Sequence, residues 1–166
     1  MADDGANPYG LSDEVIAALE ARFRATPLHA LLGLEFLERT DEHVVVSMPV
    51  RNEAFGSTGN LHGGAIATLI DVAAASAAAR SSSFVPGQNT LVTADLHVRY
   101  LGRPKGDVVR AVATVVRAGR QLVVVECRVL DPEDRVIAVA DFAGMVVPLR
   151  DPLLPGAEPD RSAPEL

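Results

Sequence analysis

Residues 59–79, GNLHGGAIATLIDVAAASAAA, form a glycine-rich turn that leads into a segment of high helix propensity. The predicted helix runs from residue 63 to about residue 81 and is apolar on nearly every side, which is typical of a buried helix. Its many alanines would let β-strands approach it closely. Asp71 lies in its middle, and because a charge at the centre of a bilayer span is costly, we expect burial in a protein core and no membrane contact.

β-strands are predicted both before and after this helix in the sequence. Before it, residues 34–50 read as two strands joined near Asp41-Glu42, and residues 52–60 read as a loop. After it, alternation over residues 90–101 predicts a long strand with even-numbered residues on one face and odd-numbered residues on the other. Three more strands are expected at about 107–117, 121–130 and 136–147, joined by two segments with hairpin chemistry.

A first helix is expected from about Leu11, with Ser12 as its N-cap, to the Thr26-Pro27 step. The order is then helix, strand pair, buried helix and four antiparallel strands. This order predicts an α+β fold in which a sheet curls around one central helix. We expect a single domain at residues 11–148, a flexible N-terminus at 1–10 and a Pro-rich, disordered tail at 149–166.

The composition narrows the class of protein. The chain has 166 residues, 48% of them hydrophobic, with a net charge of −7. An acidic chain repels polyphosphate, so a nucleic-acid partner is disfavoured. The single cysteine excludes an internal disulfide and any multi-thiolate metal site, and the four histidines lack metal-ligand spacing. The first residues carry no basic region and no apolar run, so we expect no secretory signal and a cytoplasmic location.

The two glycines at the start of the buried helix, Gly63 and Gly64, leave the backbone open to another molecule. The first turn of a helix has N–H groups without intrahelical partners and carries partial positive charge. Such a site suits an anion, or a carbonyl oxygen that becomes negative during a reaction. Close packing of the helix against a strand would explain the same glycines, and the pattern leaves both interpretations open.

Asp71 is the one charged residue in the middle of the apolar helix, where burial of its carboxylate would cost free energy. An unpaired buried carboxylate is strongly unfavourable, so Asp71 should face a cavity or a partner, either as a functional carboxylate or as a structural one bonded to an amide or a neighbouring subunit. Gly63 and Asp71 are about 12 Å apart along one helix, too far to act on one carbonyl. If both act on one substrate, an antiparallel helix from a second subunit must complete the site, which predicts a homodimer with two composite sites.

Residues 62–71, His-Gly-Gly-Ala-Ile-Ala-Thr-Leu-Ile-Asp, with the strand at 91–101 and Pro104 after it, resemble the hotdog-fold acyl-CoA thioesterases of the PaaI type. The similarity spans roughly residues 27–148. It implies a hotdog fold, in which an antiparallel sheet wraps a central helix, and homodimers that pair as a dimer of dimers. It also implies an acyl-CoA substrate.

The resemblance implies a role for each residue that matches the motif. The Gly63 N–H would polarise the thioester carbonyl, with Gly64 beside it, and His62 would shape that end of the site. Asp71 of the facing subunit would be the nucleophile or the general base, and Thr93 would orient the water or the carboxylate. Many members carry an asparagine six residues before the histidine. That position is Gly56 here, with Asn60 nearby out of register, and we expect Gly56, Asn60 and Gly64 to contribute to substrate binding.

The other candidate functional residues also have purely structural explanations. Arg103 and Lys105 could hold coenzyme A phosphates or lie in a solvated turn. Asp95, His97 and Arg99 share a strand face that is expected to be solvated, and Cys127 is expected to be a buried, inert thiol. The acyl pocket would be lined by some of four side chains, Phe23, Ile66, Ile70 and Val85.

We therefore expect a thioester hydrolase that needs no metal or redox cofactor and converts an acyl- or aryl-CoA into a free acid and CoA. The alternative is a non-catalytic acyl-CoA-binding or sensing protein on the same fold. A hotdog dehydratase or hydratase is a third option, although no histidine lies on the central helix to carry its proton chemistry.

Overall fold

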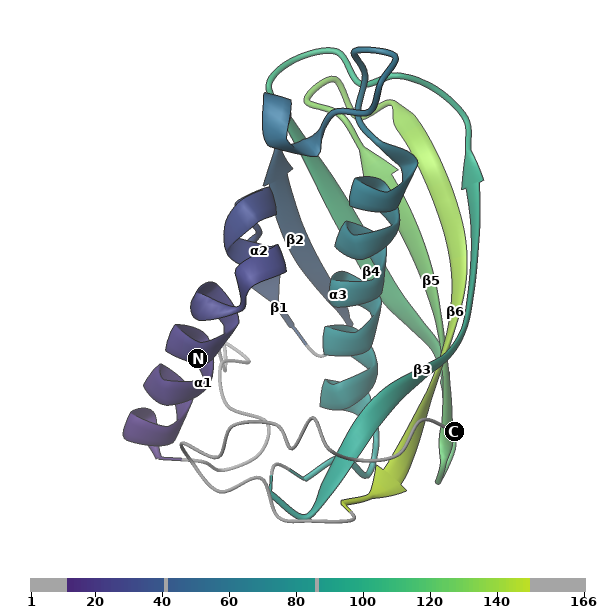
Figure 1. The fold of residues 1–166 in the computed structure, drawn as a ribbon. Helices are drawn as coiled ribbons and strands as arrows, with labels where there is room; N and C mark the ends of the chain where they lie inside the picture. The colour runs from purple at the N-terminus through teal and green to yellow at the C-terminus, as the bar shows by residue number, and fades with distance from the viewer. Residues whose placement is uncertain (1–11, 41, 86, 150–166) are drawn as a thin grey trace, which may run out of the picture.

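The computed structural model describes residues 12–40, 42–85 and 87–149, in which one antiparallel sheet surrounds a long helix (Figure 1). The helices are α1 (Asp13–Ala25), α2 (Pro27–Leu32) and α3 (Gly63–Ser81), with a 3-10 helix η1 (Asn52–Ala54). The strands are β1 (Glu35–Arg39), β2 (His43–Pro49), β3 (Asn89–Tyr100), β4 (Val108–Ala118), β5 (Leu122–Leu130) and β6 (Val136–Pro148). The predicted α+β architecture is confirmed.

The six strands lie in the order β1-β2-β4-β5-β6-β3. Strand β3 therefore pairs with β6 on one side only and forms an edge of the sheet, as β1 does at the other end. The sheet curves around α3, and α1 and α2 lie beside that helix on the same side of the sheet (Figure 1). None of the described helices is long and apolar enough to cross a bilayer.

The alanines of α3 form its contact with the sheet, as their small size predicts. Ala73, Ala74, Ala77 and Ala78 are almost completely buried, together with Leu69 and Ile70. The inward-facing residues of β2, β4, β5 and β6 are also mostly valine and alanine. Small side chains on both surfaces let the sheet lie close to the helix, because close-packed interiors leave no room for gaps.

The N-terminal region contains one more helix than the sequence predicted. Helix α1 ends at Ala25, as the Thr26-Pro27 step indicates, but Pro27 then starts α2. Proline is favourable at the first position of a helix because its missing N–H has no partner there anyway. Gly33 ends α2 in the left-handed conformation with φ 65°, and its N–H bonds back to Ala30.

The regular alternation predicted for β3 is wrong, because the strand contains a β-bulge. Thr93 pairs with Gly144 and Asp95 pairs with Ala143, so Ala94 has no opposite residue on β6. Before the bulge the odd-numbered residue Leu91 packs against the core, and after it the even-numbered Leu96 and Val98 do. The strand thus exchanges its inner and outer faces at Ala94.

The predictions for the two termini concern residues that lie outside the described part of the chain, apart from Ser12 and Leu149 at its limits. The described elements all belong to the region between residues 13 and 148.

Candidate functional site

The start of α3 leaves one backbone donor without an acceptor. The His62 N–H donates to the Ala54 carbonyl at 2.8 Å, and the Ala65 and Ile66 N–H groups both donate to the His62 carbonyl, at 3.0 and 3.2 Å. The Gly64 N–H donates to the His62 ring at 2.8 Å. Among the described residues, the Gly63 N–H has no acceptor. It lies at the positive end of the helix dipole and can receive an oxygen that gains negative charge.

His62 is the N-cap of α3. Its backbone is extended, with φ −66° and ψ 135°, and Nδ1 of its ring accepts the Gly64 N–H. Because Nδ1 accepts, the ring proton lies on Nε2. A Cβ at residue 64 would lie 2.9 Å from Nδ1, so any larger residue there would displace the His62 ring. His62 therefore occupies the donor next to the Gly63 N–H.

Tyr100, at the end of β3, contacts the same helix terminus. Its hydroxyl donates to the Gly63 carbonyl at 2.9 Å. A Cβ at residue 63 would lie 3.3 Å from Cζ of the ring. The packing explanation for Gly63 is therefore correct in part, since a β3 side chain approaches the glycine closely. Tyr100 was not predicted as a site residue. The sequence showed only that a hydroxyl-bearing side chain stands at the end of a predicted strand.

Asp71 lies two turns further along α3, half-buried, and its carboxylate points to β3. Thr93 donates from Oγ1 to Oδ1 of Asp71 at 2.7 Å. Within the described residues no cation pairs with Asp71, and the hydrogen bond it accepts comes from a hydroxyl rather than a backbone amide. Charge-assisted bonds of this kind hold a carboxylate in one orientation. The structure thus brings together Asp71 and Thr93, while Gly63, His62 and Gly64 form a separate group at the helix start.

Arg103 and Lys105 lie in the exposed loop between β3 and β4, which is fastened by a buried carboxylate. Asp131, with no exposed surface, accepts the Lys105 N–H at 3.1 Å and the Arg135 N–H at 3.1 Å, and it also pairs with the Arg135 guanidinium. The Arg135 side chain, more than the backbone donors, holds the pKa of Asp131 well below its usual range. Sequence analysis missed Asp131, which looked like an ordinary turn residue.

The remaining predicted residues lie in the turn before α3. Gly56 packs against the histidine: a Cβ there would lie 3.1 Å from Cδ2 of His62. The Asn60 amide donates to the Thr58 carbonyl at 3.0 Å and so is engaged within its own turn. Their part in substrate binding stays a prediction.

A cavity of about 290 Å³ adjoins the histidine side of the α3 terminus. Its wall includes Leu28 and Leu31 of α2, Phe55 after η1, and His62, Gly64 and Thr68. None of the four side chains expected to line an acyl pocket is among its lining residues. Ile66 and Ile70 are buried in the core instead, because they lie on the face of α3 that meets the sheet.

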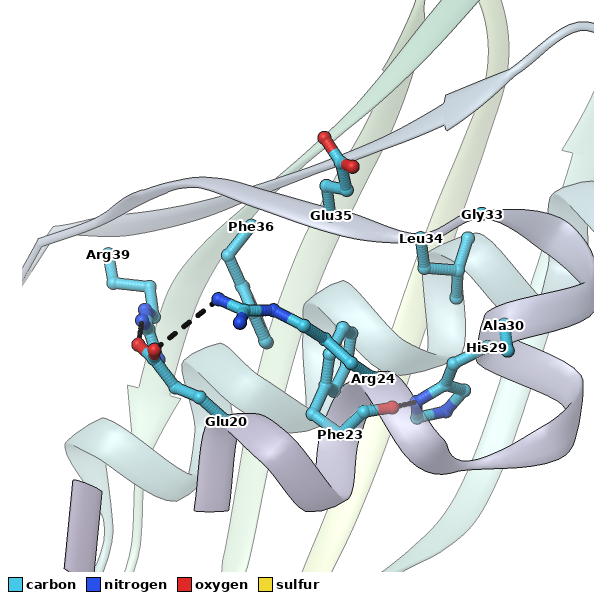
Figure 2. A pocket seen from close by; sticks show the side chains of 10 residues that line it. All are labelled: Glu20, Phe23, Arg24, His29, Ala30, Gly33, Leu34, Glu35, Phe36 and Arg39. Carbon is cyan, nitrogen blue, oxygen red and sulfur yellow. Dashed lines mark hydrogen bonds and ion pairs between the residues drawn. The ribbon is translucent and has the colours of Figure 1, made fainter. Parts of the chain in front are cut away.

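A second cavity, of about 490 Å³, lies between the N-terminal helices and β1 (Figure 2). Phe23 lines this cavity, packed against Phe36 with ring centroids 4.4 Å apart. Figure 2 shows Arg24 and Arg39 both directed at Glu20. Apart from Phe23, none of the residues predicted for the site or the acyl pocket lines this cavity. Across the described residues, no three His, Cys, Asp or Glu side chains gather as a metal site would require.

The other side chains singled out in the sequence lie apart from the site. His97 and Arg99 are exposed on the outer face of β3 and lie 4.0 and 3.5 Å from Asp141 of β6. Cys127 faces the core from β5 and is 1% exposed. Burial raises the pKa of its thiol to about 12, so it is not a nucleophile at neutral pH.

Comparison with known proteins gives a consistent result. The family model described as "Thioesterase superfamily" matches residues 58–138, which include Gly63, Asp71 and Thr93. "Putative esterase ComA2" of Bacillus subtilis is 30% identical over 66% of this chain and 85% of its own length. "Putative esterase VNG_1336C" of Halobacterium salinarum is 32% identical over 74% of this chain and 82% of its own length.

Solved structures agree with these relatives. A thioesterase of Pseudomonas aeruginosa has a TM-score of 0.73 and 27% identity, covering 80% of this chain and 94% of its own. The PaaI protein of Escherichia coli has a TM-score of 0.68 and 20% identity, covering 83% and 96%, and this likeness shows the fold alone. With two relatives at 30% identity or more along most of their length, the chain belongs to the thioesterase superfamily and has the hotdog fold.

Proposed function

We propose that this protein is an acyl-CoA thioesterase of the PaaI type, acting in the cytoplasm, that hydrolyses an acyl- or aryl-CoA to the free acid and CoA. The Gly63 N–H, the one donor of the first turn of α3 without an acceptor among the described residues, carries the proposal. It would donate to the thioester carbonyl and stabilise the negative charge that develops on that oxygen.

Asp71 would supply the second half of the chemistry. As a general base it takes a proton from water while the water oxygen attacks the carbonyl carbon; as a nucleophile it attacks the carbon directly and water then cleaves the anhydride. In both routes the C–S bond breaks, the CoA sulfur leaves as a thiolate that takes up a proton, and the acid is released. The Thr93 hydroxyl, 2.7 Å from Oδ1, would aim the carboxylate.

The two groups would meet across a subunit interface. The distance along α3 keeps Gly63 and Asp71 of one protomer about 12 Å apart, so Asp71 of a second copy would complete each site. Strand β3 supports this arrangement, because no strand of the described residues pairs with its outer edge and its side chains are largely exposed in the protomer. An unpaired edge strand is a ready surface for an antiparallel copy. Two such dimers would form the dimer of dimers.

The substrate would lie along the same terminus of α3. The cavity beside His62 has a mainly apolar wall from α2 and would take the acyl or aryl group. Arg103 and Lys105, exposed in the fastened β3–β4 loop, would pair with the phosphates of CoA. Gly56 and Asn60 would shape the turn that closes this end of the site.

Hydrolysis of a panel of acyl- and aryl-CoAs tests the activity. Asp71→Asn keeps the shape and the bond from Thr93 but removes the base, so kcat should fall by about 10²- to 10⁴-fold. Asp13→Asn, exposed in the first turn of α1, is the matched control and should retain activity. Full activity of Asp71→Asn would refute the role of Asp71. Binding of CoA thioesters without turnover by the wild type would favour the non-catalytic alternative.

Subunit complementation tests the composite site. Gly63→Pro removes the donor, and proline suits both the first helical position and the extended His62 before it. Each variant alone, Gly63→Pro or Asp71→Asn, should be inactive. Refolded together in equal amounts, half of the dimers are mixed and each has one intact site, so about a quarter of the wild-type activity should return. No recovery from mixed dimers would show that one protomer supplies both groups.

A further inference from the structure

We propose that Tyr100 is a positioning residue for the Gly63 N–H, holding the first peptides of α3 so that this donor is fixed before the substrate binds. The inference rests on the proposed function for its effect on turnover, and on the hydrogen bond between the Tyr100 hydroxyl and the Gly63 carbonyl for its structure.

The two peptide groups that flank Gly63 are each held by contacts at their polar atoms. The preceding peptide carries the Gly63 N–H, and its carbonyl, that of His62, accepts from Ala65 at 3.0 Å and from Ile66 at 3.2 Å. The following peptide has the Gly64 N–H bonded to the His62 ring at 2.8 Å and the Gly63 carbonyl bonded to Tyr100 at 2.9 Å. The Gly63 N–H is thus the one group of both peptides that is left for a ligand.

Glycine at position 63 makes an additional restraint useful. A glycine has more accessible backbone conformations than any other residue, so the bonds to the His62 carbonyl hold one of its two peptides and the other needs contacts of its own. The Tyr100 ring supplies one of these contacts: a Cβ at residue 63 would be only 3.3 Å from Cζ and 3.4 Å from the hydroxyl oxygen. The ring covers one side of the glycine while leaving the backbone N–H open.

The Gly63 N–H can stabilise the transition state only if it already points to the place where the carbonyl oxygen gains negative charge. Removing one such donor typically lowers kcat by 10²- to 10³-fold. Loss of the Tyr100 hydroxyl would loosen the donor rather than remove it, so a smaller effect is expected. Because a donor that is aimed at the transition state acts mainly on the chemical step, kcat should change more than KM.

The first experiment replaces the hydroxyl alone. Tyr100→Phe keeps the ring over Gly63, so the fold and the dimer should be retained, and kcat should fall about tenfold with KM within about a factor of two. Val116→Thr, exposed on β4, is the control and should keep wild-type kcat. Wild-type kcat in Tyr100→Phe would overturn the proposal, as would an equal loss in the control.

The second experiment does not depend on turnover, so it separates this inference from the proposed function. With ¹⁵N-glycine labelling, hydrogen exchange of the Gly63 and Gly64 amides can be followed in the absence of substrate. The Gly64 amide, bonded to His62, should exchange about tenfold faster in Tyr100→Phe, whereas the exposed Gly102 should be unchanged. Equal exchange of Gly64 in both proteins would overturn the proposal even if thioesters are hydrolysed.

A double-mutant cycle tests the contact between the two residues. Gly63→Ala places a methyl group against the Tyr100 ring and should lower kcat severalfold. In a Tyr100→Ala background the three atoms nearest to that methyl group are gone, so the same change should have less effect. An equal penalty of Gly63→Ala in both backgrounds would show that the ring does not restrain the glycine.

Discussion

Thr93 and Asp71 are joined by a 2.7 Å hydrogen bond between β3 and α3, although twenty-two positions separate them in the chain. The bond fixes the orientation of the one carboxylate on the outer side of the central helix. It also attaches the edge strand to the helix at a second point, in addition to the contact between Tyr100 and Gly63. Edge strand and helix therefore form one rigid unit at the proposed site.

The Thr93 hydroxyl should contribute to turnover through this bond. Thr93→Val removes the hydroxyl but keeps the shape, and losing a hydrogen bond to a charged group costs about 2 kcal/mol, so kcat should fall about tenfold or more. Thr93→Ser restores a hydroxyl and should retain most of the activity. Steady-state kinetics of the two variants check this, and similar kcat values for both would contradict it.

Gly56 should be needed for the position of the His62 ring. In Gly56→Ala the new methyl group would lie 3.1 Å from Cδ2, so the ring must shift and its bond to the Gly64 N–H weakens. We expect kcat to fall severalfold in Gly56→Ala and at least as far in Gly56→Asn, whose side chain is larger. Ser57→Ala, exposed in the same turn, is the control. Activity equal to the wild type in Gly56→Asn would contradict the prediction.

Arg103 and Lys105 should act on binding rather than on chemistry. Arg103→Ala and Lys105→Ala should each raise KM for an acyl-CoA severalfold with little change in kcat, because they remove charges that would pair with the CoA phosphates. The same acyl group on a short thiol without phosphates gives the control measurement, for which KM should not change. A rise in KM for both substrates would show that the two side chains do not act through the phosphates of CoA.

The Asp131 pair should make stability depend on pH. Because Arg135 lowers the pKa of Asp131 in the folded protein, the unfolded chain binds protons more readily, and the stabilisation is complete above the ordinary pKa near 4. It is then lost as the pH falls through the lower pKa of the folded state. The difference in free energy of unfolding between wild type and Asp131→Asn should be largest at pH 6 to 7 and should narrow below about pH 4. Urea titrations at several pH values measure it, and a constant difference would contradict the assignment.

Cys127 should be inert in the folded protein. Its thiol is buried and its pKa is raised to about 12, so almost no thiolate forms at pH 8. A thiol reagent such as Ellman's should leave the native protein unlabelled and label the single cysteine after unfolding in guanidinium chloride. Rapid labelling of the native protein would show that β5 opens readily.

The sequence predicted the elements of the fold well because their signals are local. The alanine-rich run, the alternating strands and the Pro27 break each follow from residue type and spacing. The family resemblance pointed to Thr93 and Asp71 together, and the structure joins them by a hydrogen bond, while their roles stay a prediction. Tyr100 and Asp131 were missed because their roles depend on contacts between segments: one reaches a helix thirty-seven positions earlier, and the other meets the backbone of a loop twenty-six positions earlier.

The unpaired Ala94 has a consequence for how this strand can vary in evolution. In an uninterrupted strand Thr93 and Tyr100 would point in opposite directions, because seven steps separate them and side chains alternate. Because of the extra residue, the partners of Thr93 and Tyr100 on β6, Gly144 and Ala138, are an even number of positions apart. Thr93 and Tyr100 therefore point to the same face, and both reach α3. Ala94 can therefore be exchanged for many residue types, but it cannot be deleted, nor a neighbour inserted, without detaching one end of the strand from the helix. Strand length, more than strand composition, is the constraint.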